Sequence, residues 1–336
     1  MALDSGSRQW LIKLFGKSVR FKEPMSKHTY FRVGGPAEAY VAPENFKELV
    51  TLIKWTLQKN IPYFVIGDGT NLLVKDRGIH GVVITLKKCL KKITLVCKEP
   101  ICKEPVCKEK DRTIVAAMAG VKMQTLCSFA IEQGLGGMNF ALGIPGTVGG
   151  GIMMNAGTAC GSMESVLDSV KILLPTGGVQ RIEREDLNFS YRKISWAKGI
   201  KAEGLKTNGR NRDDHGQTII LEGCFCLYPS DRQKLEKEAE EILKTRYKNQ
   251  PANLPSAGCF FKNPLHGKTA GQLIESAGLK GKRKGGARIS SKHANFIINT
   301  GKASAEEILE LKELAQETVK KMFDVDLETE VKIIGL

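Results

Sequence analysis

Long apolar runs are missing from this 336-residue chain, since none approaches the roughly 20 residues that a helix needs to cross a bilayer. The amino terminus also lacks the succession of basic, apolar and small residues that marks a secretory leader. Nine cysteines are present, but they are scattered without the spacing of a disulfide framework. We therefore expect a cytoplasmic protein of two or three globular domains, with no membrane insertion and with free thiols.

Metal-binding spacing is missing as well. Residues 97–110 repeat the unit CKEPI CKEPV CKEK, which places Cys97, Cys102 and Cys107 at equal intervals. Three thiols could bind a metal, but zinc sites favour close cysteine pairs plus a fourth ligand. The prolines and alternating charges suit a solvated loop better, so we expect no metal and interpret this stretch as an insertion near 93–111. A second polar, glycine-rich insertion is predicted near 195–217.

A block of one charge sign is also absent, although the formal net charge is +15. The basic residues are spread through several stretches beside glycines or acids, and no RNA-binding or helix-turn-helix signature accompanies them. Two interpretations remain: a nucleic-acid-binding protein, or a solvated basic surface that attracts anionic small molecules. We favour the second, and we expect a monomer with no nucleic-acid partner.

The most informative feature that is present is the stretch GIPGTVGGGIMMNAG at 143–157, which contains six glycines. Such a run indicates a backbone that turns at positive φ or approaches another group closely. Exposed backbone N–H groups there could bind anionic oxygens. The interleaved apolar residues argue against a flexible linker. The stretch has neither the strand–GxGxxG–helix order of a Rossmann fingerprint nor the GK[ST] of a P-loop, so spacing alone leaves its ligand unnamed.

Hydrophobic periodicity predicts an α+β fold. Helices are expected at 46–57, 123–131 and 231–247, and a capping box of Ser304 and Glu307 begins another near the end of the chain. Strands are expected at 63–66, 81–86, 113–119, 219–227 and 331–334, with a hairpin around 175–178.

Eight segments together resemble one known family. They read HTYFRVGGPAEAYVAP (28–43), GDGTNLLVKDRG (67–78), GIPGTVGGGIMMNAG (143–157), NFSYRK (188–193), SAGCFFKNP (256–264), AGQLIESAGLKG (270–281), HANFIIN (293–299) and LETEVKIIG (327–335). In this order and spacing they are similar to the UDP-N-acetylenolpyruvoylglucosamine reductase (MurB) family. The likeness covers nearly the whole chain apart from an N-terminal extension, 1–27, and the two insertions.

The resemblance implies a two-subdomain FAD-binding domain of the PCMH or vanillyl-alcohol-oxidase type over 28–227. A smaller α+β substrate-binding domain would follow over 228–336, with its last strand returning to the active site. The implied reaction is reduction of the enolpyruvyl ether of UDP-N-acetylglucosamine to UDP-N-acetylmuramate in peptidoglycan precursor synthesis, with FAD as cofactor and NADPH as reductant. The chain lacks the tyrosine-bearing substrate loop of one subtype, so it resembles the subtype without it.

Three residues match the catalytic positions of the family. Hydride transfer from flavin N5 to the terminal enolpyruvyl carbon places negative charge on the α-carbon and carboxylate, as an enolate. Arg192 would bind that charge through its planar fork of donors, together with Glu330. Cys259, where much of the family has serine, would protonate the α-carbon, because a free thiol with a pKa of about 8.5 is protonated at neutral pH yet more acidic than an alcohol.

Each of these residues also has an ordinary structural explanation. Arg192 could be a surface arginine in an ion pair, and Cys259 a small buried cysteine. Glu330 could be an exposed carboxylate of a strand. Glu328, two residues earlier, would lie on the same strand face, so only the family pattern selects Glu330.

The resemblance also implies two sets of binding residues. Contacts to FAD are expected from Gly67, Asp68, Gly69, Thr70, Asn71, Leu72, Gly143, Ile144, Pro145, Gly146, Gly149, Gly150, Asn155, Ala156 and Gly157, with Asn71 also available to cap its turn. Contacts to the substrate are expected from Tyr191, Lys262 and Asn263. Two further alternatives remain open, another FAD-linked oxidase or dehydrogenase of the same fold and a relic of the fold that serves as a structural partner.

Overall fold

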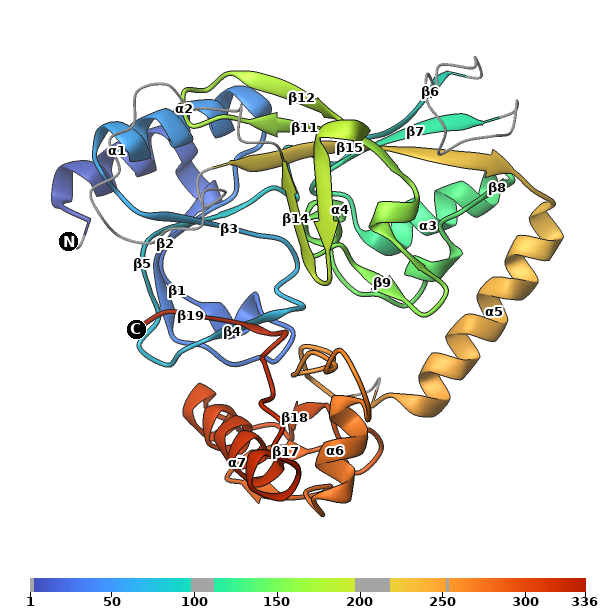
Figure 1. The fold of residues 1–336 in the computed structure, drawn as a ribbon. Helices are drawn as coiled ribbons and strands as arrows, with labels where there is room; N and C mark the ends of the chain where they lie inside the picture. The colour runs from blue at the N-terminus through green and yellow to red at the C-terminus, as the bar shows by residue number, and fades with distance from the viewer. Residues whose placement is uncertain (1–2, 98–111, 197–217, 252–253) are drawn as a thin grey trace.

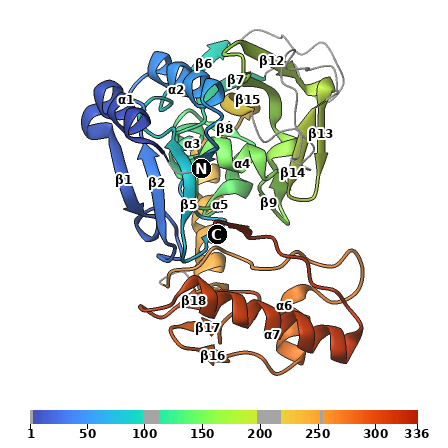
Figure 2. The same cartoon turned by 90° about the vertical axis from the view of Figure 1, so that its left-hand side faces the viewer.

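The computed structural model describes residues 3–97, 112–196, 218–251 and 254–336, which form three packed bodies in chain order (Figure 1). Two bodies lie side by side, and the carboxyl-terminal body lies beneath them in both views (Figures 1 and 2). Cys102, Cys107 and most of the two predicted insertions lie outside the described residues.

The first body is a four-stranded sheet in the order β1-β2-β5-β3, in which β1 alone runs antiparallel to its neighbour. Helices α1 and α2 share one core with the sheet, and Trp10 of α1 stacks on Trp55 of α2 with 4.3 Å between ring centroids. The stretch 1–27, expected to be an N-terminal extension, thus contributes a helix and an edge strand. The elements are α1 (Ser5–Phe15), β1 (Val19–Pro24), β2 (Pro36–Val41), α2 (Phe46–Gln58), β3 (Tyr63–Ile66), β4 (Leu72–Val74) and β5 (Ile79–Thr85).

The second body is an antiparallel sheet in the order β12-β11-β15-β7-β6, with β8 paired to the end of β15. Helices α3 and α4 lie on one side of this sheet, and the β13–β14 hairpin extends from it (Figure 1). The elements are β6 (Ile93–Cys97), β7 (Thr113–Met118), α3 (Met123–Glu132), β8 (Leu135–Gly136), α4 (Val148–Met153), β9 (Gly157–Thr158), β10 (Gly161–Ser162), β11 (Leu167–Leu173), β12 (Val179–Glu183), β13 (Leu187–Ser190), β14 (Lys193–Trp196) and β15 (Ile219–Pro229).

Helix α5 leads from the second body to the third, whose core surrounds Phe260 and Phe261. The capping box of α7 is present as predicted, since Ser304 Oγ accepts from the N–H of Glu307 at 3.1 Å. The predicted helices agree with α2, α3 and α5 to within two residues. The elements are α5 (Arg232–Asn249), α6 (Ala270–Ser276), β16 (Arg283–Lys284), β17 (Ala287–Ile289), β18 (Ile297–Asn299), α7 (Ala305–Phe323) and β19 (Lys332–Ile334).

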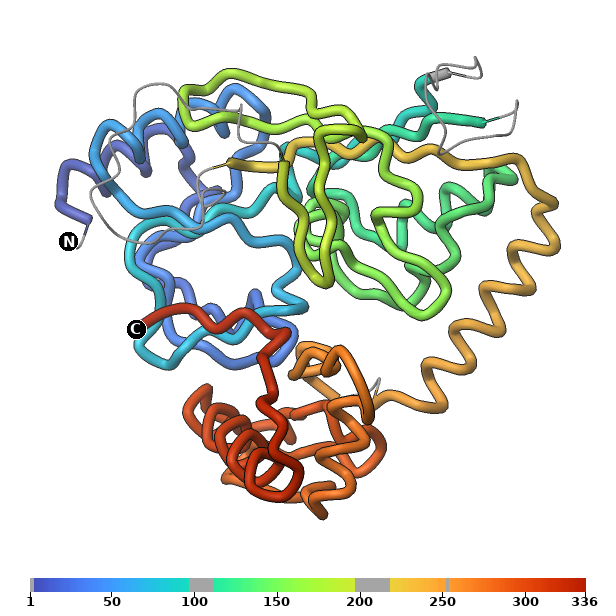
Figure 3. Tube along the Cα trace, viewed as in Figure 1, coloured from blue at the N-terminus to red at the C-terminus, as the bar shows by residue number. Residues whose placement is uncertain are grey.

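The end of the chain leaves the third body and returns to the first. Strand β19 pairs in parallel with β4, and the tube in Figure 3 shows this red segment lying on the first body. A second tie comes from Asp76, after β4, whose two carboxylate oxygens accept from the N–H groups of Ala305 and Glu306 at 3.0 Å each. The side chain of Asn299 also donates to the carbonyl of Phe31 at 2.9 Å. The third body is therefore fastened to the first by several independent contacts.

Candidate active site

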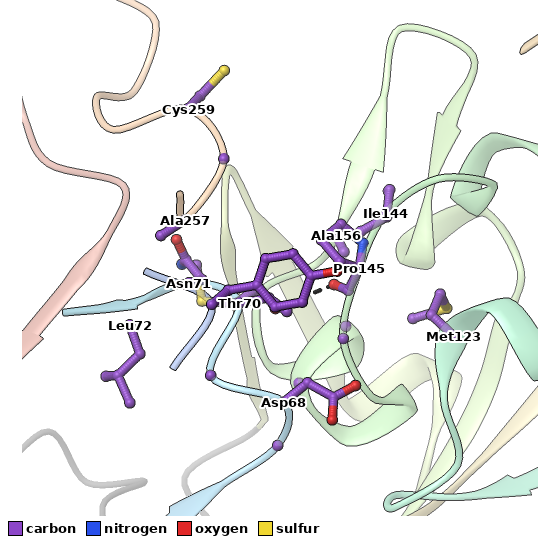
Figure 4. Close-up of a pocket in the computed structure, with 18 of the residues that line it drawn as sticks. Asp68, Thr70, Asn71, Leu72, Met123, Ile144, Pro145, Ala156, Ala257 and Cys259 are labelled. Carbon is purple, nitrogen blue, oxygen red and sulfur yellow. Dashed lines mark hydrogen bonds between the residues drawn. The ribbon is translucent and has the colours of Figure 1, made fainter. Parts of the chain in front are cut away.

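A cavity of about 620 Å³ opens where the three bodies meet. Its walls include the loop between β3 and β4, the glycine run before and within α4, and the segment 256–259 of the third body (Figure 4). The end of α5 also lines it. Each wall belongs to a different part of the chain, so folding is needed to assemble the site.

The loop between β3 and β4 presents its backbone to the cavity. Gly69 has a φ of +64°, and a Cβ there would lie 2.1 Å from the carbonyl oxygen of His28, so this position requires glycine. Within the part of the chain that the structure describes, no hydrogen bond uses the backbone N–H of Asp68, Gly69 or Thr70. Such N–H groups are suited to anionic oxygens, including those of a diphosphate.

The glycine run forms the facing wall. The hydroxyl of Thr70 donates to the carbonyl of Pro145 at 3.2 Å, so the two loops are in direct contact (Figure 4). Helix α4 begins after Thr147, whose hydroxyl accepts from the N–H of Gly150 at 3.4 Å. All but two of the predicted cofactor-binding residues line the cavity, namely Gly67, Asp68, Gly69, Thr70, Asn71, Leu72, Gly143, Ile144, Pro145, Gly146, Gly150, Ala156 and Gly157.

The two exceptions are Gly149 and Asn155. A Cβ on Gly149 would meet the Cβ of Ala119 at 2.8 Å, so this glycine allows α4 to pack closely on the chain after β7. Asn155 is buried, and its amide donates to the carbonyl of Ser190 at 3.3 Å. Gly149 lines a smaller neighbouring cavity that shares Gly67 and Gly150 with this one, and Asn155 supports the hairpin after Ser190. Direct contact of these two residues with a cofactor stays a prediction.

The walls fit the flavin dinucleotide that the resemblance implies. The two loops bring backbone donors and glycine surfaces to one place, where the diphosphate could approach closely. Met123, Ile144 and Pro145 add apolar surface from the second body (Figure 4). Backbone donors beside apolar walls are what a planar ring system with an anionic linker requires.

Arg192 occupies the tip of the β13–β14 hairpin, in a two-residue turn with Tyr191. Its φ of +59° is uncommon for a residue with a side chain and costs roughly 1–3 kcal/mol. The guanidinium Nε donates to Glu330 Oε1 at 2.6 Å, and the guanidinium carbon Cζ lies 4.7 Å from the centroid of the Tyr191 ring. This strained turn therefore carries the arginine to the cavity edge, where it meets a carboxylate 138 residues away in sequence.

Glu330 is held by its backbone as well as by Arg192. Its N–H donates to the carbonyl of Phe260 at 2.8 Å, and its carbonyl accepts from the side-chain amide of Asn71 at 3.0 Å. Asn71 thus binds the returning end of the chain, rather than capping its own turn as expected. Glu328 points elsewhere, since its side chain is 74% exposed and pairs with Lys262, whereas that of Glu330 is 14% exposed.

Cys259 lies on the segment that enters the cavity from the third body (Figure 4). Burial, aided by the carboxylate of Glu330, raises the pKa of its thiol to about 12, while Arg192 and Arg246 act in the opposite direction. The group therefore remains a neutral thiol over the whole physiological pH range. This is the state that a proton donor needs.

The predicted substrate-binding residues lie outside the cavity lining. Lys262 pairs with Glu328 at 3.0 Å, and the side-chain oxygen of Asn263 accepts from the N–H of Ala270 at the start of α6. Tyr191 lies nearer, with its hydroxyl 3.5 Å from Glu330 Oε2. Tyr191 also forms a hydrogen bond with the backbone of Asn263, so these two residues lie close together. Contact of all three residues with the substrate stays a prediction.

Several cavity residues have no counterpart among the sequence predictions. Those with a polar or charged side-chain group include Tyr30, Arg246, Tyr247 and Lys332. Arg246 and Tyr247 belong to a strongly charged helix, in which nothing distinguishes them from solvated neighbours, so no sequence signal could have selected them.

Comparison with known proteins agrees with this geometry. Residues 37–183 match a family model for an FAD-binding domain, and residues 250–334 match one for the carboxyl-terminal domain of UDP-N-acetylenolpyruvoylglucosamine reductase. A protein of that name from Desulfosudis oleivorans is 43% identical over 99% of this chain and 100% of its own length. The chain belongs to this family. Another member, from Clostridium kluyveri, is 38% identical over 95% of this chain and 94% of its own.

A solved structure of the family has the same fold. The crystal structure of UDP-N-acetylenolpyruvylglucosamine reductase (MurB) from Thermus caldophilus matches with a TM-score of 0.70 at 31% identity, over 93% of this chain and 97% of that one. The predicted α+β class with an FAD-binding domain is thereby confirmed, and the matched domain spans strands of both the first and the second body. No helix in the described ranges is long and apolar enough to span a membrane.

Proposed function

We propose that this protein reduces the enolpyruvyl ether of UDP-N-acetylglucosamine to UDP-N-acetylmuramate, a step of peptidoglycan precursor synthesis, with NADPH as the reductant. One observation carries the proposal: Arg192, Cys259 and Glu330, from three distant segments, converge at the edge of a cavity built to hold a dinucleotide. Such convergence in a family member supports a role in the reaction that gives the family its name.

The chemistry that FAD supplies when bound is hydride transfer from NADPH to the enolpyruvyl group. The described residues supply the rest. Arg192 binds the developing enolate through its planar guanidinium, and the bond to Glu330 keeps that group at the cavity edge. Cys259 then donates its thiol proton to the α-carbon. The neutral thiol at physiological pH makes this assignment physically consistent.

The sugar nucleotide and NADPH would use the same cavity in turn, because each must reach the same flavin. Tyr191, Lys262 and Asn263 are proposed to contact the substrate, with Lys262 and Asn263 suited to a diphosphate and an N-acetyl sugar. We further propose a cytoplasmic monomer of the subtype without the tyrosine loop, with no nucleic-acid partner. Size-exclusion chromatography and a nucleic-acid shift assay at physiological ionic strength check these points.

An anaerobic absorption experiment tests the function. The purified protein is expected to show oxidised-flavin bands that bleach on adding NADPH and return on adding the enolpyruvyl sugar nucleotide. Lactate or a phenol serves as the comparison substrate. Bleaching by lactate or a phenol, with no response to the enolpyruvyl sugar, would assign the protein to another flavoenzyme class, and a colourless protein would contradict the cofactor.

A further inference from the structure

Arg246, near the end of α5, is a cavity-lining arginine for which the described residues offer no carboxylate within ion-pair distance. Its side chain makes one weak hydrogen bond, from Nη2 to Gln250 Oε1 at 3.4 Å. Burial lowers the pKa of its guanidinium. A partly buried cation without a partner is unfavourable, so it is better explained by an anion that arrives from solution.

The fold holds this guanidinium in place. A Cβ on Gly143 would lie 2.8 Å from both Cδ and Nε of Arg246, so the arginine stem lies flat on a backbone that has a φ of +74°. Leu243, one turn earlier, lines the cavity beside it. Glycine at 143 therefore has a second use, because it leaves room for the arginine to lie against the cavity wall.

The charges around Cys259 indicate what the anion is. Arg192, Arg246 and Cys259 line the same cavity, so a ligand that reaches the thiol enters a space bounded by both guanidinium groups. The charge of Arg192 is already neutralised by Glu330 at 2.6 Å. A carboxylate arriving next to Cys259 would thus meet a neutral pair and one unpaired cation. Lys332, the other unpaired cation of the lining, is exposed to solvent.

We propose that Arg246 binds the carboxylate of the enolpyruvyl group and supplies the net positive charge that Arg192, held by Glu330, does not. This inference rests on the proposed function, because it assigns a contact within that substrate. The two arginines then have different roles. Arg246 attracts and orients the carboxylate, and Arg192 stabilises the charge that develops during reduction. The chemistry that Arg246 recognises is an anionic oxygen, so the phosphates of the substrate and of FAD are the competing sources.

Binding to the oxidised holoenzyme, without NADPH, separates these sources. Three ligands are titrated by the change in flavin absorbance: the enolpyruvyl sugar nucleotide, UDP-N-acetylmuramate, which also has a carboxylate, and UDP-N-acetylglucosamine, which has none. For Arg246→Met, the affinity for the two carboxylates is expected to fall roughly 10- to 100-fold, the range for loss of a charge-assisted bond. The affinity for UDP-N-acetylglucosamine and the flavin content stay unchanged.

Lys244→Met is the matched control, since it removes the same charge from an exposed position of the same helix. Arg246→Lys tests charge against geometry and should recover part of the affinity. If Arg246→Met bound all three ligands equally more weakly, Arg246 would be assigned to the diphosphate of the substrate. If the variant lost its flavin, Arg246 would be assigned to the cofactor. If all three affinities were unchanged, Arg246 would have no role in ligand binding. Each result overturns this inference alone, whereas a wild-type enzyme that neither binds nor reduces the enolpyruvyl sugar would overturn the proposed function.

Discussion

The cavity has two dissimilar halves. One half is backbone, made by the loop at 67–72 and the glycine run at 143–157, and it offers N–H groups and close approach. The other half is side chains, made by Arg192, Cys259 and Glu330. The backbone half depends on the local backbone conformation of each loop, whereas the side-chain half depends on contacts between three segments far apart in sequence. Cofactor binding therefore depends mainly on local conformation, and the chemistry depends on long-range contacts.

The two halves are also secured differently. The backbone half is closed by one direct bond between its loops, from Thr70 to Pro145. The side-chain half depends on docking of the third body, through the pairing of β19 with β4, the amide of Asn71 and the carboxylate of Asp76. Variants aimed at each half should therefore separate flavin binding from reduction of the sugar nucleotide.

The largest effect is expected at Cys259. Cys259→Ala should leave flavin reduction by NADPH unchanged but slow reoxidation by the enolpyruvyl sugar about 10²- to 10⁴-fold, the usual contribution of a positioned proton donor. Cys259→Ser keeps a donor of similar size and should retain substantial activity. Stopped-flow measurement of the two half-reactions decides the matter. Normal reoxidation in the alanine variant would exclude the thiol from the reaction.

In the backbone half, substitution of Gly69 is expected to impair flavin binding rather than the chemical step. Gly69→Ala places a Cβ against the carbonyl of His28 and forces a strained φ, so flavin content should fall and the free energy of unfolding should drop by about 2 kcal/mol or more. Gly267→Ala is the control, because Gly267 also has a positive φ, of +82°, but no atom within 4 Å. Flavin absorbance and thermal unfolding report the two quantities. Equal behaviour of both variants would show that backbone strain alone matters.

A smaller effect is expected at the contact between the first and third bodies, where Asp76 accepts hydrogen bonds from the start of α7. Asp76→Ala removes the cap that the first body provides for α7, and should cost about 1–2 kcal/mol, as for other lost helix caps. Because the third body carries Cys259 and Glu330, KM for the sugar nucleotide should rise while flavin content stays constant. Asp326→Ala is the control, since its ion pair with Lys320 is exposed. Flavin loss in Asp76→Ala would contradict the independence of the two halves.

The smallest effect is expected from pH. The folded-state pKa of the Cys259 thiol is raised to about 12, so the folded protein prefers the protonated form. Its contribution to stability is complete below the ordinary thiol pKa of about 8.5 and is lost as pH rises toward 12. Between pH 6 and about 8.5 we expect no change in its protonation. Alkylation by iodoacetamide, compared between wild type and Cys259→Ser, should detect no Cys259 thiolate; rapid alkylation at neutral pH would refute the raised pKa.

The parts that were predictable share a physical reason. Helix α2, the capping box of Ser304 and Glu307, and the glycine run depend on interactions between residues a few positions apart. The resemblance to the family also predicted the cofactor-binding residues. All of them except Gly149 and Asn155 line the cavity. The packing of Gly149 on Ala119 and the bond from Asn155 to Ser190 join residues far apart in sequence, which local patterns do not encode.

Local sequence patterns were enough to predict where the backbone must turn, where helices begin, and which residue types are available for the chemistry. The choice between Glu328 and Glu330 required the folded structure. Glu328 is exposed and pairs with Lys262, whereas Glu330 is largely buried and meets Arg192. Tertiary structure also brought Arg246 to the cavity and assigned Asn71 to the chain end. Such placements depend on contacts between residues far apart in sequence, which local propensity does not encode.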